Sequence, residues 1–281
     1  MSDILITPDE LAELTARDEH VRILDVRYRL DKPDGREDHR SGHIPGAVYV
    51  DLDAELAARG VAADGRHPLP GTPDLQQAAR RWGVNDGDTV VVYDDYNSVA
   101  ASRAWWLLTD AGVDARILDG ALRGWVSAGH ALEQGETTPV PGTVTLSAGR
   151  LPQLTTDGAA QLAATGILID VRAAERYRGE TESIDPVAGH IPGARNVPFA
   201  ELLDERRRLK NPEQLRQIFT EVGATPDEQV GVYCGSGVTA SLGAAALREA
   251  GFAPRLYPGS WSAWSSTPGR PVVVGSKPFG E

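Results

Sequence analysis

Short apolar runs alternate along the chain with stretches in which apolar residues recur every three or four positions. Polar or glycine residues bound each run, as is typical of buried strands; the runs lie at 22–27, 48–50, 89–93, 116–118, 167–172, 230–233 and 255–257. The helical spacing predicts helices over 74–82, 98–111 and 241–250, and a short helix with Thr7 as its N-cap and Pro8 in its first turn. Because strands and helices alternate, we expect an α/β fold with mostly parallel sheets and helices on both faces.

The same order of elements occurs twice. Gly-His-Ile-Pro-Gly-Ala stands at 42–47 and again at 189–194. An Asp-Val-Arg strand end recurs after 145 residues, at Asp25 and Asp170, and a tryptophan recurs after 139 residues, at Trp125 and Trp264. Such a nearly constant separation indicates a tandem duplication. We therefore expect one domain at 1–130, a linker rich in Gly, Pro and Thr at 131–151, and a second domain at 152–281.

Cys234 is the only cysteine of the 281 residues, and it stands where a predicted strand ends. A small, glycine-rich loop that leads into a helix can direct several backbone N–H groups at one atom, here the sulfur, and the helix N-terminus favours a thiolate. A lone cysteine is often buried and inert. This setting, however, should expose the sulfur and predicts a nucleophile. In the first copy Asp94 aligns with Cys234, so only the second copy can supply the sulfur.

The loop Cys-Gly-Ser-Gly-Val-Thr-Ala, residues 234–240, resembles the active-site loop of rhodanese-type sulfurtransferases. It is closest to the 3-mercaptopyruvate branch, because the thiosulfate branch tends to place basic residues directly after the cysteine, where Gly235 and Ser236 stand here. The resemblance covers nearly the whole chain. It implies two tandem rhodanese-like domains, of which the first is silent, a persulfide on Cys234, and no cofactor or metal. It also implies that the loop binds the donor through Gly235, Ser236, Gly237, Val238 and Thr239.

The resemblance assigns roles to residues outside the loop as well. Arg178, which follows the Asp-Val-Arg strand only in the second copy, matches an arginine that binds the anionic end of the substrate. A guanidinium suits that task, because it binds a carboxylate through two parallel hydrogen bonds. The second arginine that the mercaptopyruvate branch usually adds is missing from 182–185. Asp53 and His67 match an acidic residue and a histidine that act with the loop serine, Ser236; the alternative is that His67 belongs to an ordinary ordered loop.

Several matched residues are expected to be structural, since the silent copy carries them too. His43 and His190 should satisfy backbone groups in turns shaped by Gly and Pro. The Asp-x-Arg pairs, Asp25 with Arg27 and Asp170 with Arg172, should be ion pairs of the fold. The matched tryptophans should pack in the core and between domains; they are Trp105, Trp106, Trp125, Trp261 and Trp264.

A formal net charge of −12 argues against nucleic acid or an anionic membrane as a partner. One cysteine excludes an intrachain disulfide and a cysteine-based metal site. The first ten residues lack the pattern of a secretory signal, and no run of about 18 apolar residues suggests a membrane span. A free working thiol fits the cytoplasm, and two internal domains suggest a self-sufficient monomer.

Three function classes compete for a cysteine in such a loop. A sulfurtransferase would take sulfur from 3-mercaptopyruvate or, alternatively, thiosulfate, and pass it to cyanide, a thiol or a reduced redox protein. A cysteine phosphatase needs an arginine six residues after the cysteine, where Ala240 stands. A non-enzymatic binding module would not need an intact cysteine loop. The sequence therefore favours the sulfurtransferase, with 3-mercaptopyruvate as donor.

Overall fold

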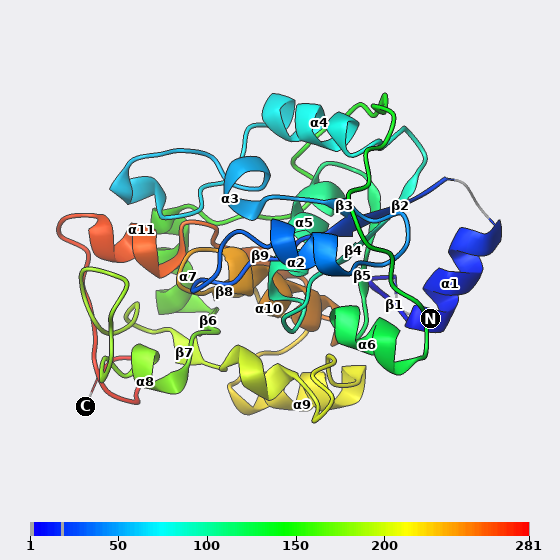
Figure 1. Cartoon of the computed structure of the whole chain (residues 1–281). Coiled ribbons are helices and arrows are strands. Elements are labelled where there is room, and N and C mark those ends of the chain that lie inside the picture. The colour runs from blue at the N-terminus through cyan, green and yellow to red at the C-terminus, as the bar shows by residue number, and fades with distance from the viewer. Residues whose placement is uncertain (1–2, 18–19, 281) are drawn as a thin grey trace. The chain divides into compact units, whose positions relative to one another are not determined.

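The computed structural model describes residues 3–17 and 20–280 (Figure 1). The described chain forms two compact units. The first contains the residues up to Ala58, then Leu69–Leu151 and Arg206–Arg208. The second contains Arg59–Pro68, Pro152–Glu205 and the residues from Leu209 on. The stretch Arg59–Pro68 of the first half thus belongs to the second unit, and the segment predicted as the linker belongs to the first.

The first unit is built on a five-stranded sheet in which every strand pairs in parallel with its neighbours. In spatial order its strands are β1 (Leu5–Ile6), β5 (Asp114–Leu118), β4 (Thr89–Tyr93), β2 (Val21–Asp25) and β3 (Val48–Tyr49). Its helices are α1 (Pro8–Arg17), α2 (Arg36–Ser41), α3 (Leu52–Glu55), α4 (Thr72–Arg81), α5 (Val99–Asp110) and α6 (Ala121–Ser127). The predicted strands and helices of this half are thus present.

The N-cap of α1 confirms one detail of the sequence analysis. Thr7 Oγ1 accepts a hydrogen bond from the Glu10 N–H at 3.2 Å, and the Glu10 carboxylate accepts one from the Thr7 N–H at 2.8 Å. This reciprocal pair satisfies two N–H groups that the first turn would otherwise leave open.

The second unit is built on a four-stranded parallel sheet. In spatial order its strands are β7 (Arg195–Asn196), β6 (Ile167–Asp170), β8 (Val230–Tyr233) and β9 (Pro254–Leu256). Its helices are α7 (Thr156–Thr165), α8 (Ala174–Tyr177), α9 (Pro212–Glu221), α10 (Val238–Glu249) and α11 (Ser260–Ser266), with 3-10 turns η1 (Ala62–Asp64) and η2 (Phe199–Leu202). An isolated parallel bridge between Gln153 and Leu256 stands where the first unit has β1.

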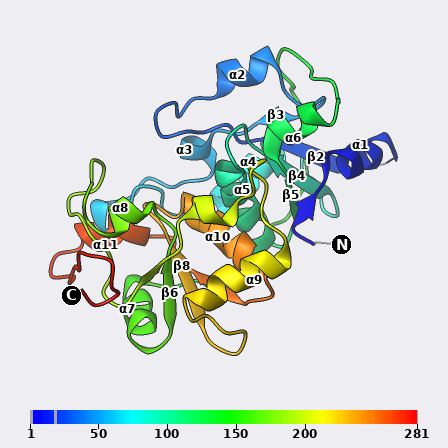
Figure 2. The same cartoon turned by 90° about the horizontal axis from the view of Figure 1, so that it is seen from below.

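Helices cover both faces of the second sheet, as the sequence predicts (Figure 2). A methyl group built on Gly231 of β8 would meet Leu162 of α7 on one face. Val232, which points to the opposite face, lies next to Gly243 of α10. Buried side chains of α7 and α11 pack together with Leu168 and Tyr233 of the sheet in one core cluster.

The matched Asp-x-Arg pairs and histidines play the structural roles expected of them. Arg172 Nε lies 3.1 and 3.0 Å from the two Asp170 carboxylate oxygens, and Arg27 is paired with Asp25 in the same way. His190 Nδ1 lies 2.8 Å from the Tyr177 carbonyl oxygen, and the ring stacks on Tyr177. The matched tryptophans are buried. No helix among residues 3–17 and 20–280 is long and apolar enough to cross a membrane.

Candidate active site

The loop that follows β8 places Cys234 at the carboxyl end of the parallel sheet, beside the end of β6. Strand β6 pairs with β8 through Asp170 and Tyr233, so both strands end at the same edge. The Gly237 N–H points at Cys234 Sγ, with an N–S distance of 3.2 Å. Carboxyl ends of parallel strands are the usual place for ligands in α/β folds. The loop therefore directs a backbone N–H at the sulfur at the edge of the sheet where ligands usually bind.

Two expectations about this loop are wrong. Cys234 is only 3% exposed, although the setting was expected to expose its sulfur. Helix α10 begins at Val238, three residues before the predicted start, so Val238 and Thr239 belong to its first turn. The earlier helix start follows from Gly237, whose φ of 84° turns the chain directly into the helix. A Cβ at this position would collide with the Pro258 carbonyl oxygen.

The first turn of α11 holds the loop from the other side. Ser260 Oγ accepts a hydrogen bond from the Cys234 N–H at 3.1 Å and lies 4.0 Å from the sulfur. The N–H groups of Trp261 and Ser262 donate to the carbonyl oxygens of Cys234 and Gly235, at 2.9 and 2.8 Å. Ser260 is not among the residues predicted from the sequence. The only sequence signal for Ser260 is its position directly after Gly259, which follows strand β9.

His67 and Ser236 lie together as the resemblance implied. His67 Nδ1 is 2.8 Å from Ser236 Oγ, and both side chains are buried. This contact is possible because Arg59–Pro68 is part of the second unit. Asp53 lies on α3 of the first unit, and its part in this group stays a prediction. Burial raises the pKa of the Asp53 carboxyl, and the nearby Asp51 adds to the rise.

Arg178 and Arg176 differ sharply in their surroundings. Arg178 pairs with Glu180 through two hydrogen bonds of 2.6 and 2.7 Å on the exposed side of the turn. Arg176, in contrast, lies beside the Cys234 loop, because a Cβ built on Gly235 would be 3.4 Å from its Nη1 atom. The two residues point in different directions because side chains two positions apart on a helical turn lie on opposite sides.

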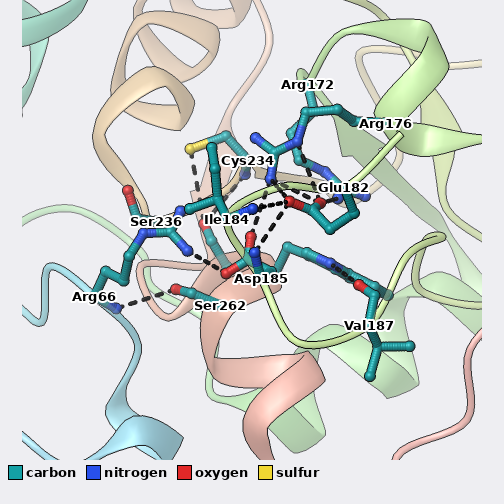
Figure 3. A network of polar contacts seen from close by, with 12 residues as sticks. Arg66, Arg172, Arg176, Glu182, Ile184, Asp185, Val187, Cys234, Ser236 and Ser262 are labelled. Atoms are coloured by element: carbon teal, nitrogen blue, oxygen red, sulfur yellow. Dashed lines mark hydrogen bonds and ion pairs between the residues drawn. The ribbon is translucent and has the colours of Figure 1, made fainter. Parts of the chain in front are cut away.

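A second arginine, Arg66, also borders the loop, and its Nη2 atom is 3.1 Å from the same Cβ position. Asp185 lies between the two arginines (Figure 3): one of its oxygens pairs with Arg66 and the other lies 3.0 Å from Arg176 Nη2. Burial raises the pKa of Asp185, Arg66 opposes that rise, and Glu182 adds to it. The sequence gives no local signal for Arg66 or Asp185, which are 119 residues apart.

The matching loop of the first unit carries a carboxylate, Asp94, at the position of the sulfur. Asp94 Oδ1 accepts hydrogen bonds from the Tyr96 and Ser98 N–H groups at 2.8 and 2.9 Å. Its Oδ2 atom accepts two more, from Ala100 and Ala101, at 2.9 and 3.1 Å. Burial nevertheless raises the pKa of Asp94 to about 6, against the effect of these donors. In the first copy the side chain of Asp94 thus takes up four N–H donors of its own loop.

No group of three or more His, Cys, Asp or Glu side chains that could hold a metal ion occurs within the described part of the chain. The charged groups near Cys234 are paired with one another, as Figure 3 shows.

Comparison with known proteins gives a consistent result. The sequence profile of the rhodanese-like domain matches residues 7–128 and 150–267. A putative thiosulfate sulfurtransferase, SseB of Mycobacterium tuberculosis H37Rv, is 47% identical over 97% of this chain and 98% of that protein. A probable 3-mercaptopyruvate sulfurtransferase of Pseudomonas aeruginosa is 43% identical over 96% of this chain and 98% of that protein. The crystal structure of SseA from Escherichia coli, a 3-mercaptopyruvate sulfotransferase, superposes with a TM-score of 0.79 at 34% identity, covering 92% of this chain and 98% of that one.

Proposed function

The chain belongs to the rhodanese family of sulfurtransferases, and we propose that it moves a sulfane sulfur from 3-mercaptopyruvate to cyanide or a thiol acceptor through a persulfide on Cys234. The observation that carries this proposal is the Gly237 N–H aimed at Cys234 Sγ at 3.2 Å. A hydrogen bond of this kind stabilises a thiolate before the reaction and the anionic persulfide after it.

In the first half-reaction the Cys234 thiolate attacks the donor sulfur. A bond forms between the two sulfur atoms, the bond between carbon and the donor sulfur breaks, and its electron pair leaves with the carbon as the enolate of pyruvate. The enolate takes up a proton and leaves as pyruvate. In the second half-reaction the acceptor attacks the outer sulfur of the persulfide and returns Cys234 to a thiolate.

Ser236 and His67 are the groups that supply the proton for the enolate in this proposal. Ser236 stands two residues after the nucleophile, and its hydroxyl lies 2.8 Å from His67 Nδ1. A hydroxyl backed by an imidazole can deliver a proton and be reprotonated in turn. The same proposal gives Asp53 the role of the acidic residue that acts with His67.

We assign the anion-binding role to Arg176 in place of Arg178. Arg176 borders Gly235, whereas the Arg178 guanidinium is bound by Glu180. The donor carboxylate would accept hydrogen bonds from the guanidinium and from the N–H groups of the loop at Gly235–Thr239.

Thiosulfate is the second candidate donor, because the SseB relative that bears that name is 47% identical. Against it stands the loop itself, which places the uncharged Gly235 and Ser236 where a doubly charged donor would be served better by basic side chains. The proposal includes a reducing compartment such as the cytoplasm, a thiol or reduced redox protein as a possible natural acceptor, and a monomer as the working unit.

Thiocyanate formation from cyanide, measured side by side with the two donors, tests the proposal. We expect a higher kcat/KM with 3-mercaptopyruvate and slow use of thiosulfate. A higher kcat/KM with thiosulfate would make thiosulfate the assigned donor. The absence of sulfur transfer from both donors would overturn the proposed function.

A further inference from the structure

Charged side chains next to Cys234 form an unbroken chain of ion pairs in which positive and negative groups alternate, and Figure 3 shows its part from Arg172 to Arg66. Its members are three carboxylates and three guanidinium groups: Asp170, Arg172, Glu182, Arg176, Asp185 and Arg66. The side chains of both Glu182 and Asp185 are only 2% exposed. The arginines that could bind an anionic donor are therefore already matched in number by internal carboxylates.

Asp185 occupies the decisive place in this chain. It bridges Arg66 and Arg176, the two guanidinium groups whose nitrogen atoms lie 3.1 and 3.4 Å from a Cβ built on Gly235. Glu182, in contrast, binds Arg176 from the side of Arg172. A carboxylate that bridges two guanidinium groups occupies the same N–H groups that would otherwise bind the carboxylate of the sulfur donor. Asp185 thus stands where part of an anionic substrate would otherwise be bound.

We propose that Asp185 is a specificity-determining residue of the sulfur-donor site, an internal competitor that lowers the affinity for anionic donors and does so most for doubly charged ones. The inference rests on the proposed function only for the identity of the donors. Its physical basis is that a fixed negative charge raises the free energy of a bound anion in proportion to the charge of that anion.

The electrostatic effect of Asp185 on an anion that approaches Cys234 can be measured without any sulfur donor. Because Cys234 is the only cysteine, thiol-alkylating reagents report on this one site. The probes are iodoacetate, an anion, and iodoacetamide, its neutral analogue, and the observable is the ratio of their alkylation rates. Asp185→Asn should raise the iodoacetate-to-iodoacetamide ratio by about 3- to 10-fold at low salt, the size expected for one partly screened charge several ångströms away.

Glu180→Gln is the matched control, because it removes the same charge from the exposed pair with Arg178. Its ratio should stay at the wild-type value. Arg66→Gln is the second variant and should lower the ratio, so the test stands even if Asp185→Asn fails to fold. A ratio that responds to none of these changes, or equally to Asp185→Asn and Glu180→Gln, overturns the inference.

Donor kinetics give the second readout. In Asp185→Asn we expect kcat/KM to rise about fivefold for the singly charged 3-mercaptopyruvate and about 25-fold for the doubly charged thiosulfate, chiefly through KM, since the effect scales with charge. Equal gains for the two donors, or a loss for both in a folded variant, would contradict a role in specificity. A responsive alkylation ratio without any sulfur transfer would instead overturn the proposed function and leave the inference on charge intact.

Discussion

His67 Nδ1 lies 2.8 Å from Ser236 Oγ, although 169 residues separate the two in the chain. A proton relay needs such a contact, because the hydroxyl can donate only as fast as it is reprotonated. The pair should also matter more for 3-mercaptopyruvate than for thiosulfate, because the two leaving groups differ in their need for a proton. Pyruvate leaves as an enolate that must take up a proton, whereas sulfite leaves from thiosulfate as a stable anion.

We therefore expect His67→Ala and Ser236→Ala each to lower kcat with 3-mercaptopyruvate by about 100-fold, the usual size of a lost general acid. The double variant should be no worse than the worse single variant, since the two groups act as a unit. With thiosulfate each change should cost less than about threefold. Steady-state kinetics with both donors measure this, and equal losses for both donors would rule the relay out.

Arg176 and Arg178 provide a comparison within one turn of the chain. Arg176→Ala should lower kcat/KM by about 10- to 150-fold, the cost of a lost charge-assisted hydrogen bond of about 1.5–3 kcal/mol. Arg178→Ala removes the same type of side chain two positions away. The contact described for the Arg178 guanidinium is its pairing with the exposed Glu180. The kcat/KM of Arg178→Ala should stay within about twofold of wild type. The reverse order of effects would return the anion-binding role to Arg178.

Asp94 should make the stability of the first unit depend on pH. Burial raises the pKa of its carboxyl to about 6 in the folded chain, above the usual value of 3.8. Between these two values the folded state holds a proton that the unfolded state has lost, so stability falls as pH rises from about 4 to about 6, by about 2–3 kcal/mol, and is level above.

Denaturant unfolding at several pH values tests this dependence. Asp94→Asn should lack that fall, while Asp31→Asn, at an exposed position, should keep it. The comparison uses the change with pH, because the asparagine also alters the hydrogen bonds to the loop at every pH. An identical pH dependence in wild type and Asp94→Asn would show that Asp94 does not titrate in this range.

Alanine substitutions at Gly237 and Gly269 distinguish the cost of backbone strain from the cost of a steric collision. Both have positive φ angles, 84° and 80°, but a Cβ on Gly237 would collide with the Pro258 carbonyl oxygen, while one on Gly269 would meet nothing within 4 Å. Gly269→Ala should cost about 1 kcal/mol of stability from strain alone. Gly237→Ala should cost at least about 1–3 kcal/mol more and abolish most turnover, because the N–H that faces Cys234 must move. Thermal unfolding together with kcat measures both, and similar losses in the two variants would contradict the steric argument.

The sequence predicts well what depends on local pattern. The apolar runs identify the strands, and the strand-to-loop-to-helix order places Cys234 at the end of β8, where the structure has it. It fails where side-chain direction or distant contacts decide. Arg176 and Arg178 look alike in the sequence, and only the turn of α8 turns one toward Gly235 and the other toward Glu180. The pairing of Arg66 with Asp185 depends on Arg59–Pro68 joining the second unit, which no local pattern indicates.

The central claim is that Cys234 carries the transferred sulfur. Mass spectrometry of the whole protein, and of the peptide that contains Cys234, after brief mixing with 3-mercaptopyruvate and no acceptor tests it directly. The account predicts that the peptide gains one sulfur atom, that cyanide removes it as thiocyanate, and that Cys234→Ser gains none while keeping its fold. Continued sulfur transfer by Cys234→Ser, or turnover by the wild-type protein without any gain of sulfur on that peptide, would contradict it.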